Sequence, residues 1–541
     1  MTKYTEISLS RRLMLALIAS MVTMALPAQT NAGQKQPQLL LNVVIEGLDA
    51  TQLDLLRDYF GEEGFNRLLD QGVVLSGEYG TTLDATAAVT ELMTGASPSV
   101  TGVSSARRFD RKALRSEHIF DDGTTLGNYT TSTYSPSALL VSTLADEIRI
   151  AGGGVSQAYA VAPDPGVAIA LGGHSANCAI WIDSRNGNWA TSTFYKDPPS
   201  LLGTRNRLSH LSQRLDTLSW TPLKSSDKYP GLPEHLTHYP FRYTFGRGNQ
   251  ARFAEFKDAP GAVNSEVTSM AIDLIGTLKL GEHGGIDVLS VAYTLNPYEG
   301  GKNPDTRYEL IDSYYRLDSD LARLIKAAEK QAGANASVVM ITGTPPSSRS
   351  RRDDPRWMIP YGEFSTRKAM SLLNVYLIAL HGNGEWVQAY SDGWFYLNDK
   401  LIDERKADAA AMRAEAADFL SRMAGVKAVH TSDDVRHGRA GANPEALRRN
   451  THFATCGDML IEVLPGWQLV DDVNTQGAEQ AGKYEKVQRE TATTAPVIIM
   501  APGLQARKLH TPVDIRMVTP TVCRLLRIRS PNAASMPAIN L

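Results

Sequence analysis

The chain has 541 residues, of which 43% are hydrophobic and 21% are charged, and its formal net charge is -3. This is the composition of an ordinary globular protein, and the length suits a large α/β core that carries insertions. The near balance of acidic and basic residues argues against a nucleic-acid partner and against binding to an anionic membrane.

The first residues of the chain have the pattern of a targeting segment. Lys3, Arg11 and Arg12 precede an apolar stretch from Leu13 to Leu26, and small residues then lead to a cleavage point after Ala32. The apolar stretch is too short for an ordinary membrane-spanning helix. The sequence therefore predicts a cleaved signal peptide, a periplasmic or secreted location and no stable membrane insertion. An uncleaved anchor or a misassigned start codon is the alternative.

Apolar runs and helical periodicity alternate along the rest of the chain. The run Leu39–Ile45 is typical of a buried parallel strand, and the runs Val288–Thr294, Val338–Thr342 and Pro496–Met500 are typical of further strands. Between the second and third runs, Tyr308–Lys330 places apolar residues on one helical face. Strand, helix and strand in repetition predict an α/β fold with a doubly wound, mainly parallel sheet sandwiched by helices.

Two stretches interrupt this alternation and are predicted to be caps inserted into the core. One is rich in Gly, Ser, Asn, Trp and Tyr, and the other combines a strand-like run with an alanine-rich helix. In open α/β sheets the functional site lies beyond the carboxyl ends of the strands, so such caps shape access to it. The predicted order is a signal peptide (1–32), a first core segment (38–165), a first cap (166–258), a second core segment (259–345), an α+β second cap (346–449) and a third core segment (450–541).

Motifs spread from about Leu39 to the C-terminus carry a family resemblance. They are Phe65-Asn66-Arg67-Leu68-Leu69, the turn Thr94–Gly102, the segment from Gly173-His174 through Trp181 to Asn188-Trp189, the helix Tyr314–Ala322, and Thr519-Pro520-Thr521. In this order they resemble the alkaline phosphatase superfamily, in its type I phosphodiesterase/nucleotide pyrophosphatase-like branch. That branch includes the Thr-nucleophile alkaline phosphatases of Bacteroidota. The resemblance implies an alkaline phosphatase-like core.

The resemblance also implies where a catalytic centre would lie. Active relatives hydrolyse phosphate monoesters with two zinc ions, which activate the threonine and stabilise charge on the entering and leaving oxygens. The nucleophile position falls on Ala85, and the adjacent Thr86 reaches it only through a one-residue gap. The metal-ligand positions fall on Glu46, Leu295, Glu299, Thr344 and Pro345. A register slipped by one residue would place Asn296 and Gly300 at the second pair.

Other functional positions of the family are replaced as well. A late histidine ligand has no counterpart, because no histidine lies between His452 and His510, and the phosphate-binding positions fall on Ala106, Pro163 and Pro165. These replacements predict a catalytically inactive member that binds no zinc and needs no other cofactor. It would act as a periplasmic binding or scaffold protein for an unknown protein partner or an anionic ligand. The alternative is a hydrolase of phosphate or sulfate esters, of the phosphatase or phosphodiesterase type, with a rebuilt active site.

The sequence suggests two alternative sites in place of the family's two-zinc centre. One is an anion site built from guanidinium groups, which hold phosphate-like anions without metal. Its members would be Arg107, Arg108, Arg349, Arg351 and Arg352. The other is a single Ca²⁺ or Mg²⁺ held between Glu46 and Glu299, at the position of the family's metal centre. The alternatives are a solvated basic loop and two carboxylates that are solvated or paired with arginines.

Overall fold

The computed structural model describes residues 36–80, 84–238, 240–246, 251–298, 300, 305–346, 362–464, 467–470 and 493–541. The predicted signal peptide, residues 1–32, lies outside these ranges. Within them, no helix has both the length and the apolar character that crossing a lipid bilayer demands.

A large sheet forms the centre of the chain after Pro37. Eleven strands from the described ranges belong to it. Their order is β20 (Arg507–Lys508), β2 (Val73–Glu78), β19 (Thr494–Met500), β12 (Ser337–Thr344), β1 (Leu39–Glu46), β11 (Asp287–Thr294), β6 (Ala158–Val161), β7 (Cys178–Ile182), β8 (Trp189–Ser192) and β5 (Gly127–Asn128), with β21 (Val513–Asp514) beside β2. The longer strands are rich in Val, Ile and Leu, which suit a sheet covered on both faces.

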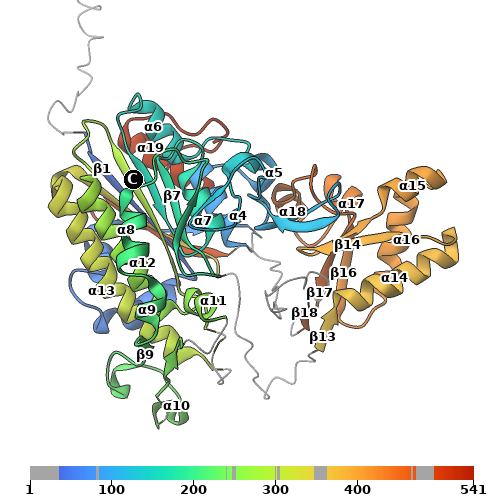
Figure 1. Ribbon diagram of the computed structural model, residues 1–541, viewed down its shortest axis with the longest axis horizontal. Helices are drawn as coiled ribbons and strands as arrows, with labels where there is room; N and C mark the ends of the chain where they lie inside the picture. Colours follow the sequence, from blue (N-terminus) through green and yellow to red (C-terminus); the bar gives the residue numbers. More distant parts are fainter. Residues whose placement is uncertain are drawn as a thin grey trace, which may run out of the picture. The chain divides into compact units, whose positions relative to one another are not determined.

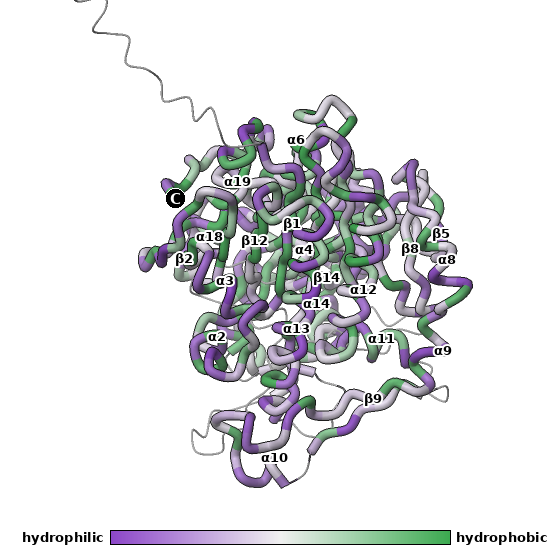
Figure 2. Tube along the Cα trace, turned by 90° about the vertical axis from the view of Figure 1, so that its left-hand side faces the viewer, coloured by the Kyte–Doolittle hydropathy of each residue, from purple (hydrophilic) through white to green (hydrophobic). Residues whose placement is uncertain are grey.

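Strand β1 lies in the middle of this sheet. It pairs in parallel with β11 on one side and β12 on the other, so that Glu46 stands level with Thr294 and Thr344. The residues Leu39–Ile45 are each at most 1% exposed. Figure 2 shows the apolar colouring along β1 and β12. The predicted apolar run is therefore the central strand of the core.

Some strands run against the others. β19 is antiparallel to both β12 and β2, and β8 is antiparallel to β7 and β5. The sheet is thus mixed but mainly parallel, and the predicted doubly wound α/β fold is confirmed. β7 and β8 belong to residues 166–258, so this segment adds strands to the central sheet as well as other elements. The predicted division into core segments and caps stays a prediction.

Helices cover both faces of the sheet (Figure 1). One layer consists of α3 (Phe65–Gln71), α12 (Pro260–Leu278) and α13 (Arg307–Ala332). α3 contacts β19, α12 contacts β11, and α13 contacts both β1 and β12. The other layer consists of α4 (Ala85–Thr94), α6 (Leu144–Ala151), α7 (Pro165–Gly172) and α19 (Val518–Leu526). α13 confirms the predicted helix, and its side chains Leu317, Leu321 and Leu324 are fully buried. Both layers are needed because parallel strands expose apolar side chains on both faces.

A second, smaller antiparallel sheet lies later in the chain. Its order is β14 (Val387–Ser391), β15 (Trp394–Leu397), β17 (Met459–Val463) and β16 (Val426–Thr431). The helices α14 (Thr366–His381) and α16 (Ala409–Ser421) pack on it around a separate core that contains Leu373, Trp386 and Phe395. The hairpin of β3 (Arg107–Asp110) and β4 (Arg115–His118) contacts this sheet.

The remaining elements are short and connect or cover the two sheets. They are α2 (Ala50–Leu56), α5 (Pro98–Thr101), α8 (Ser200–Leu208), α9 (Leu211–Leu215), α10 (Glu234–His238), α11 (Arg252–Lys257), α15 (Asp399–Arg405), α17 (Ser432–Arg436), α18 (Pro444–Asn450), β9 (Ser219–Trp220), β10 (Tyr243–Thr244), β13 (Gly362–Ser365) and β18 (Trp467–Val470). β9 pairs with β10, and β13 pairs with β18.

Candidate functional site

The carboxyl ends of β1, β11 and β12 meet at one edge of the sheet, which we call the carboxyl edge. Leu295 N donates to the Glu46 carbonyl oxygen at 2.7 Å, and Gly47 N donates to the Thr344 carbonyl oxygen at 2.8 Å. Gly47 has a φ of +78°, and a Cβ there would lie 3.2 Å from the Leu295 carbonyl carbon. Glycine permits this close approach. Glu46, Leu295 and Thr344, three predicted metal-ligand positions, thus lie side by side, with Pro345 next in the chain.

The donor atoms at these positions differ from those that zinc binds. Zinc sites in proteins use Cys sulfur, His nitrogen and Asp or Glu oxygen. Leu295 and Pro345 offer no such donor, Thr344 offers a hydroxyl, and Glu46 alone supplies a carboxylate. Across the described ranges, no group of three or more His, Cys, Asp or Glu residues is placed to hold a metal ion. The described residues therefore do not fit a two-zinc centre.

Buried polar oxygens nevertheless remain at the carboxyl edge. Thr342 Oγ1, Thr344 Oγ1 and Asn296 Oδ1 have no hydrogen-bond partner among the residues that the structure describes. Nearby, Asn264 fixes the end of β11, because its Nδ2 donates to the Thr294 carbonyl oxygen at 2.8 Å and its Oδ1 accepts from Thr294 N at 3.1 Å. Buried oxygens without a protein partner commonly bind ordered water. The edge is thus polar, although its donor set does not suit zinc.

Helix α4 begins at the predicted nucleophile position. Ala85 is its first residue, and the carboxylate of Asp84 caps the helix by accepting from Ala87 N at 3.1 Å. The methyl group of Ala85 offers no nucleophile. The neighbouring Thr86 is 2% exposed, and its Oγ1 lies 2.6 Å from the position that a Cβ on Gly166 would take. The Thr86 hydroxyl therefore faces the start of α7.

Helix α7 begins where the family places two cationic phosphate-binding residues. Pro163 and Pro165 occupy those positions, and Pro165 suits the first helical position because that residue needs no N–H. The Asp164 carboxylate caps the helix and accepts from Gly166 N at 2.8 Å and from Val167 N at 3.3 Å. The N–H groups that bind anions at other helix N-termini are therefore taken by Asp164.

His118, the last residue of β4, also faces the start of α7. Its Nε2 lies 3.1 Å from the position that a Cβ on Gly166 would take. This nitrogen has no hydrogen-bond partner among the described residues. Its Nδ1 accepts from Phe120 N at 3.2 Å, so the neutral ring carries its proton on Nε2. Burial lowers the pKa of His118, although the charges of Asp164 and Asp121 oppose this effect. Neutral His118 thus presents a buried N–H donor toward α7.

The predicted anion-binding residues Arg107 and Arg108 lie on β3. The Arg108 guanidinium contacts one Glu117 oxygen at 3.1 Å, and Arg115 contacts the other oxygen at 3.2 Å. Arg107 is exposed, and its Nη2 donates to the Ser116 carbonyl oxygen at 3.3 Å. Both arginines therefore bind groups of their own hairpin.

The other predicted site residues are Glu299, Arg349, Arg351 and Arg352, and all four lie outside the described ranges. The single-cation site with Glu46 and the arginine cluster therefore stay predictions. His118 is not among the predicted site residues. No motif marks this residue, and only the pairing of β4 with β3, which sets His118 opposite Arg107, and the packing of the hairpin bring it to α7.

The fold defines the class of the protein, an alkaline phosphatase-type α/β protein. The crystal structure of wild-type alkaline phosphatase PafA matches it with a TM-score of 0.81 at 21% identity, covering 94% of this chain and 99% of that chain. Residues 40–491 match the family described as type I phosphodiesterase / nucleotide pyrophosphatase. The chain belongs to this family, as the motifs predict.

Curated relatives match along nearly the whole chain. Alkaline phosphatase PhoV of Synechococcus elongatus is 24% identical over 536 residues, which cover 92% of each chain. Alkaline phosphatase PafA of Elizabethkingia meningoseptica is 23% identical over 539 residues, which cover 94% of this chain and 95% of the relative.

Proposed function

We propose that this protein is a catalytically inactive alkaline phosphatase-like protein that acts in the periplasm as a binding or scaffold protein. One observation carries the proposal: the carboxyl edge sets Glu46, Leu295 and Thr344 side by side where active relatives need metal ligands, and α4 opens with Ala85. Without a nucleophile no group attacks the phosphorus atom, and without a metal ion no group stabilises the charge on the leaving oxygen. The chain retains a rigid frame on which a partner or an anionic ligand can bind.

The alternative function is hydrolysis of phosphate or sulfate esters by a rebuilt site. Thr86 Oγ1 and His118 Nε2 both face Gly166, which places a hydroxyl near an imidazole. A hydroxyl nucleophile needs a base to accept its proton. The bond from Phe120 N to Nδ1 puts the imidazole proton on Nε2, the nitrogen that lies near Gly166, so this nitrogen is not free to accept a proton from a hydroxyl there. This geometry supports the binding function better than it supports hydrolysis.

The periplasmic location rests on the predicted signal peptide that ends at Ala32. The basic residues and the short apolar stretch before it are the features that export signals share. A protein in that compartment meets exported partners and small solutes that cross the outer envelope, which suits a binding role.

The test is ester hydrolysis by the purified mature chain. Wild type and Ala85→Thr are assayed with p-nitrophenyl phosphate and p-nitrophenyl sulfate, with and without added Zn²⁺, beside PafA of Elizabethkingia meningoseptica as a positive control. We expect no turnover above the buffer blank from either form, because a restored hydroxyl still lacks metal ligands. Zinc-dependent turnover by the wild type would overturn the proposal. Turnover by Ala85→Thr alone would mean that a metal centre is intact and only the nucleophile is missing.

A further inference from the structure

A pocket of about 310 Å³ lies beside the start of α7 and the end of β7. Its walls come from the segments before and after β5, the end of β7 with the turn that follows it, the first residue of α7 and the last residue of α11. The lining residues are Asp121, Thr131, Ser132, Thr133, Tyr134, Pro165, Trp181, Ile182, Asp183, Ser184, Arg185 and Lys257. We call it the β7 pocket. Its volume is at the lower end of the roughly 300–1,000 Å³ that small-molecule sites occupy.

The position of the pocket in the fold favours a ligand site. β6 and β7 run parallel to β1 and β11, so Pro165 and Asp183 follow strand ends that point to the same side of the sheet as Glu46. Ligands of open α/β sheets bind outside these strand ends. The β7 pocket includes Pro165, at a former phosphate-binding position, but the former metal positions Glu46, Leu295 and Thr344 and the former nucleophile position Ala85 are not among its lining residues.

Two cations line the β7 pocket. Lys257 is the last residue of α11 and makes no ion pair with any residue that the structure describes. Arg185 is exposed and uses one N–H to bind Ser132 Oγ at 2.7 Å. The guanidinium and the ammonium therefore keep N–H groups available, and these bind carboxylate or phosphate oxygens strongly.

The rest of the lining consists mainly of hydroxyl groups and two carboxylates. Asp183 is already bound by Thr130 Oγ1 and by the N–H groups of Arg185 and Asn186, at 2.8 Å and 3.1 Å for the two backbone donors. Asp121 accepts from Thr133 Oγ1 at 3.2 Å and keeps acceptor capacity. The hydroxyl groups of Thr131 and Ser132 and the carboxylate of Asp121 can form hydrogen bonds with a ligand that itself carries hydroxyl groups.

We propose that the β7 pocket binds a small polyhydroxylated anion, such as a sugar phosphate or a sugar acid, whose anionic group lies on Lys257 and Arg185. The ligand's hydroxyl groups bind Asp121 and the hydroxyl side chains of the pocket. This inference rests on the proposed binding function and deepens it, since it names a ligand class and a site for a chain that does not turn the ligand over.

The test is calorimetric titration of the mature chain with glucose 6-phosphate, glucuronate and neutral glucose. The variants are Lys257→Met and Arg185→Gln, and the control is Lys326→Met, an exposed lysine of α13. We expect at least one anion to bind and glucose to bind far more weakly. Each pocket variant should weaken the anion about tenfold or more, and Lys326→Met should leave it unchanged. Arg185 is exposed, so its variant stays informative if Lys257→Met fails to fold.

The outcomes separate the two levels of the proposal. No binding of either anion, equal binding of glucose, or wild-type affinity in both pocket variants would overturn the β7 pocket assignment. Release of phosphate from glucose 6-phosphate would instead overturn the inactive function. Glucuronate contains no ester, so its binding and its dependence on Lys257 decide the pocket assignment whether or not phosphate is released. If both glucuronate and glucose 6-phosphate bind, the pocket recognises the negative charge of the ligand. If only one of them binds, the pocket also recognises the type of anionic group.

Discussion

Single side chains determine what the carboxyl edge can bind. Glu46 provides a carboxylate, but Leu295 beside it provides only aliphatic carbon, and the first residue of α4 is Ala85. Thr344 Oγ1 and Asn296 Oδ1 are buried oxygens without a described partner, which favours water or a polar ligand over zinc. The proposal that this chain lacks a zinc centre therefore rests on the residue identities at these strand and helix ends.

Away from the carboxyl edge, buried Asp146 and exposed His174 form a polar pair that orders the start of α6. Asp146 is 1% exposed and accepts from Thr143 N at 2.8 Å and from Ser175 N at 2.6 Å. His174 Nε2 binds the Leu139 carbonyl oxygen at 2.9 Å, and its Nδ1 lies 3.4 Å from Asp146 Oδ2. Because both ring nitrogens face acceptors, the hydrogen bond to Asp146 raises the pKa of His174.

The pair predicts a pH-dependent contribution to stability. A histidine whose folded-state pKa is raised stabilises the protein fully below its unfolded-state pKa, and this contribution is lost as the pH rises through the folded-state pKa. His174→Gln should therefore reduce the free energy of unfolding more at about pH 5.5 than at about pH 9. Urea denaturation at the two pH values measures the difference. The control His238→Gln changes a largely exposed side chain of α10. A loss for His174→Gln that is equal at both pH values would contradict this explanation.

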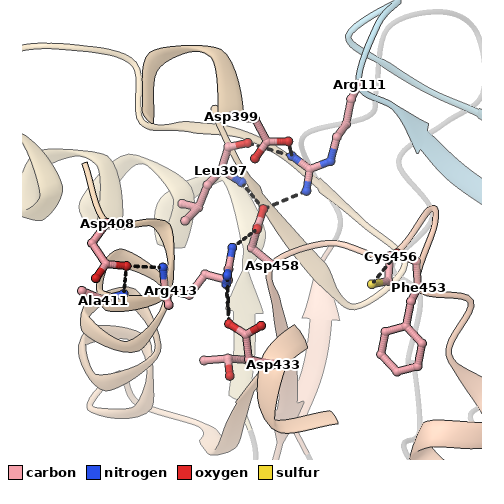
Figure 3. A network of polar contacts seen from close by, with 12 residues as sticks. Arg111, Leu397, Asp399, Asp408, Ala411, Arg413, Asp433, Phe453, Cys456 and Asp458 are labelled. Atoms are coloured by element: carbon pink, nitrogen blue, oxygen red, sulfur yellow. Dashed lines mark hydrogen bonds and ion pairs between the residues drawn. The ribbon is translucent and has the colours of Figure 1, made fainter. Parts of the chain in front are cut away.

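At the scale of elements, a buried carboxylate joins the β3–β4 hairpin to the smaller sheet (Figure 3). Asp458 is 4% exposed and accepts from Arg111 Nη2 at 2.9 Å and from Leu397 N at 2.7 Å. Arg413 of α16 lies 3.5 Å from its other oxygen, and Arg111 also contacts Asp399 at 2.9 Å. The hairpin that carries His118 toward α7 is thus anchored at its other end in the second sheet.

Removing this carboxylate should be costly because it leaves Arg111 and Arg413 partly buried without their shared partner. We expect Asp458→Ala to reduce the free energy of unfolding by about 3 kcal/mol. Guanidinium denaturation measures the loss, with Asp403→Ala on the exposed side of α15 as the matched control. A loss below about 0.5 kcal/mol, as for an ordinary surface substitution, would show that the network does not stabilise the fold.

The elements differ in how far the sequence alone predicts them. The central strand β1 and the helix α13 are predictable because an unbroken apolar run and a 3.6-residue period are local signals. The antiparallel direction of β19 and the addition of β7 and β8 to the sheet are not predictable from the sequence, because apolar content indicates burial but not strand direction. The same holds for the site: motif register identifies Glu46 and Ala85, whereas His118 and Lys257 reach their places only through packing between distant segments.

At the scale of the whole molecule, the fold of the chain matches that of wild-type alkaline phosphatase PafA over nearly its full length. Fold and chemistry are separable, because the sheet and its helices are stabilised by burial of the apolar strands and not by groups at the strand ends. The central strand of this chain is almost fully buried, since each residue from Leu39 to Ile45 is at most 1% exposed. We therefore expect a stable, ordered protein that lacks the metal centre.

The most direct test of that claim is the metal content of the mature protein. Protein produced with added zinc and purified without chelators is measured by mass spectrometry for zinc, calcium and magnesium, with PafA prepared in parallel as the metal-bearing control. We expect less than about 0.2 zinc per chain, because the described strand ends supply one carboxylate where a tetrahedral zinc needs several ligands. About two zinc ions per chain would show that the protein does hold a bimetal centre, assembled from residues other than those at the carboxyl edge.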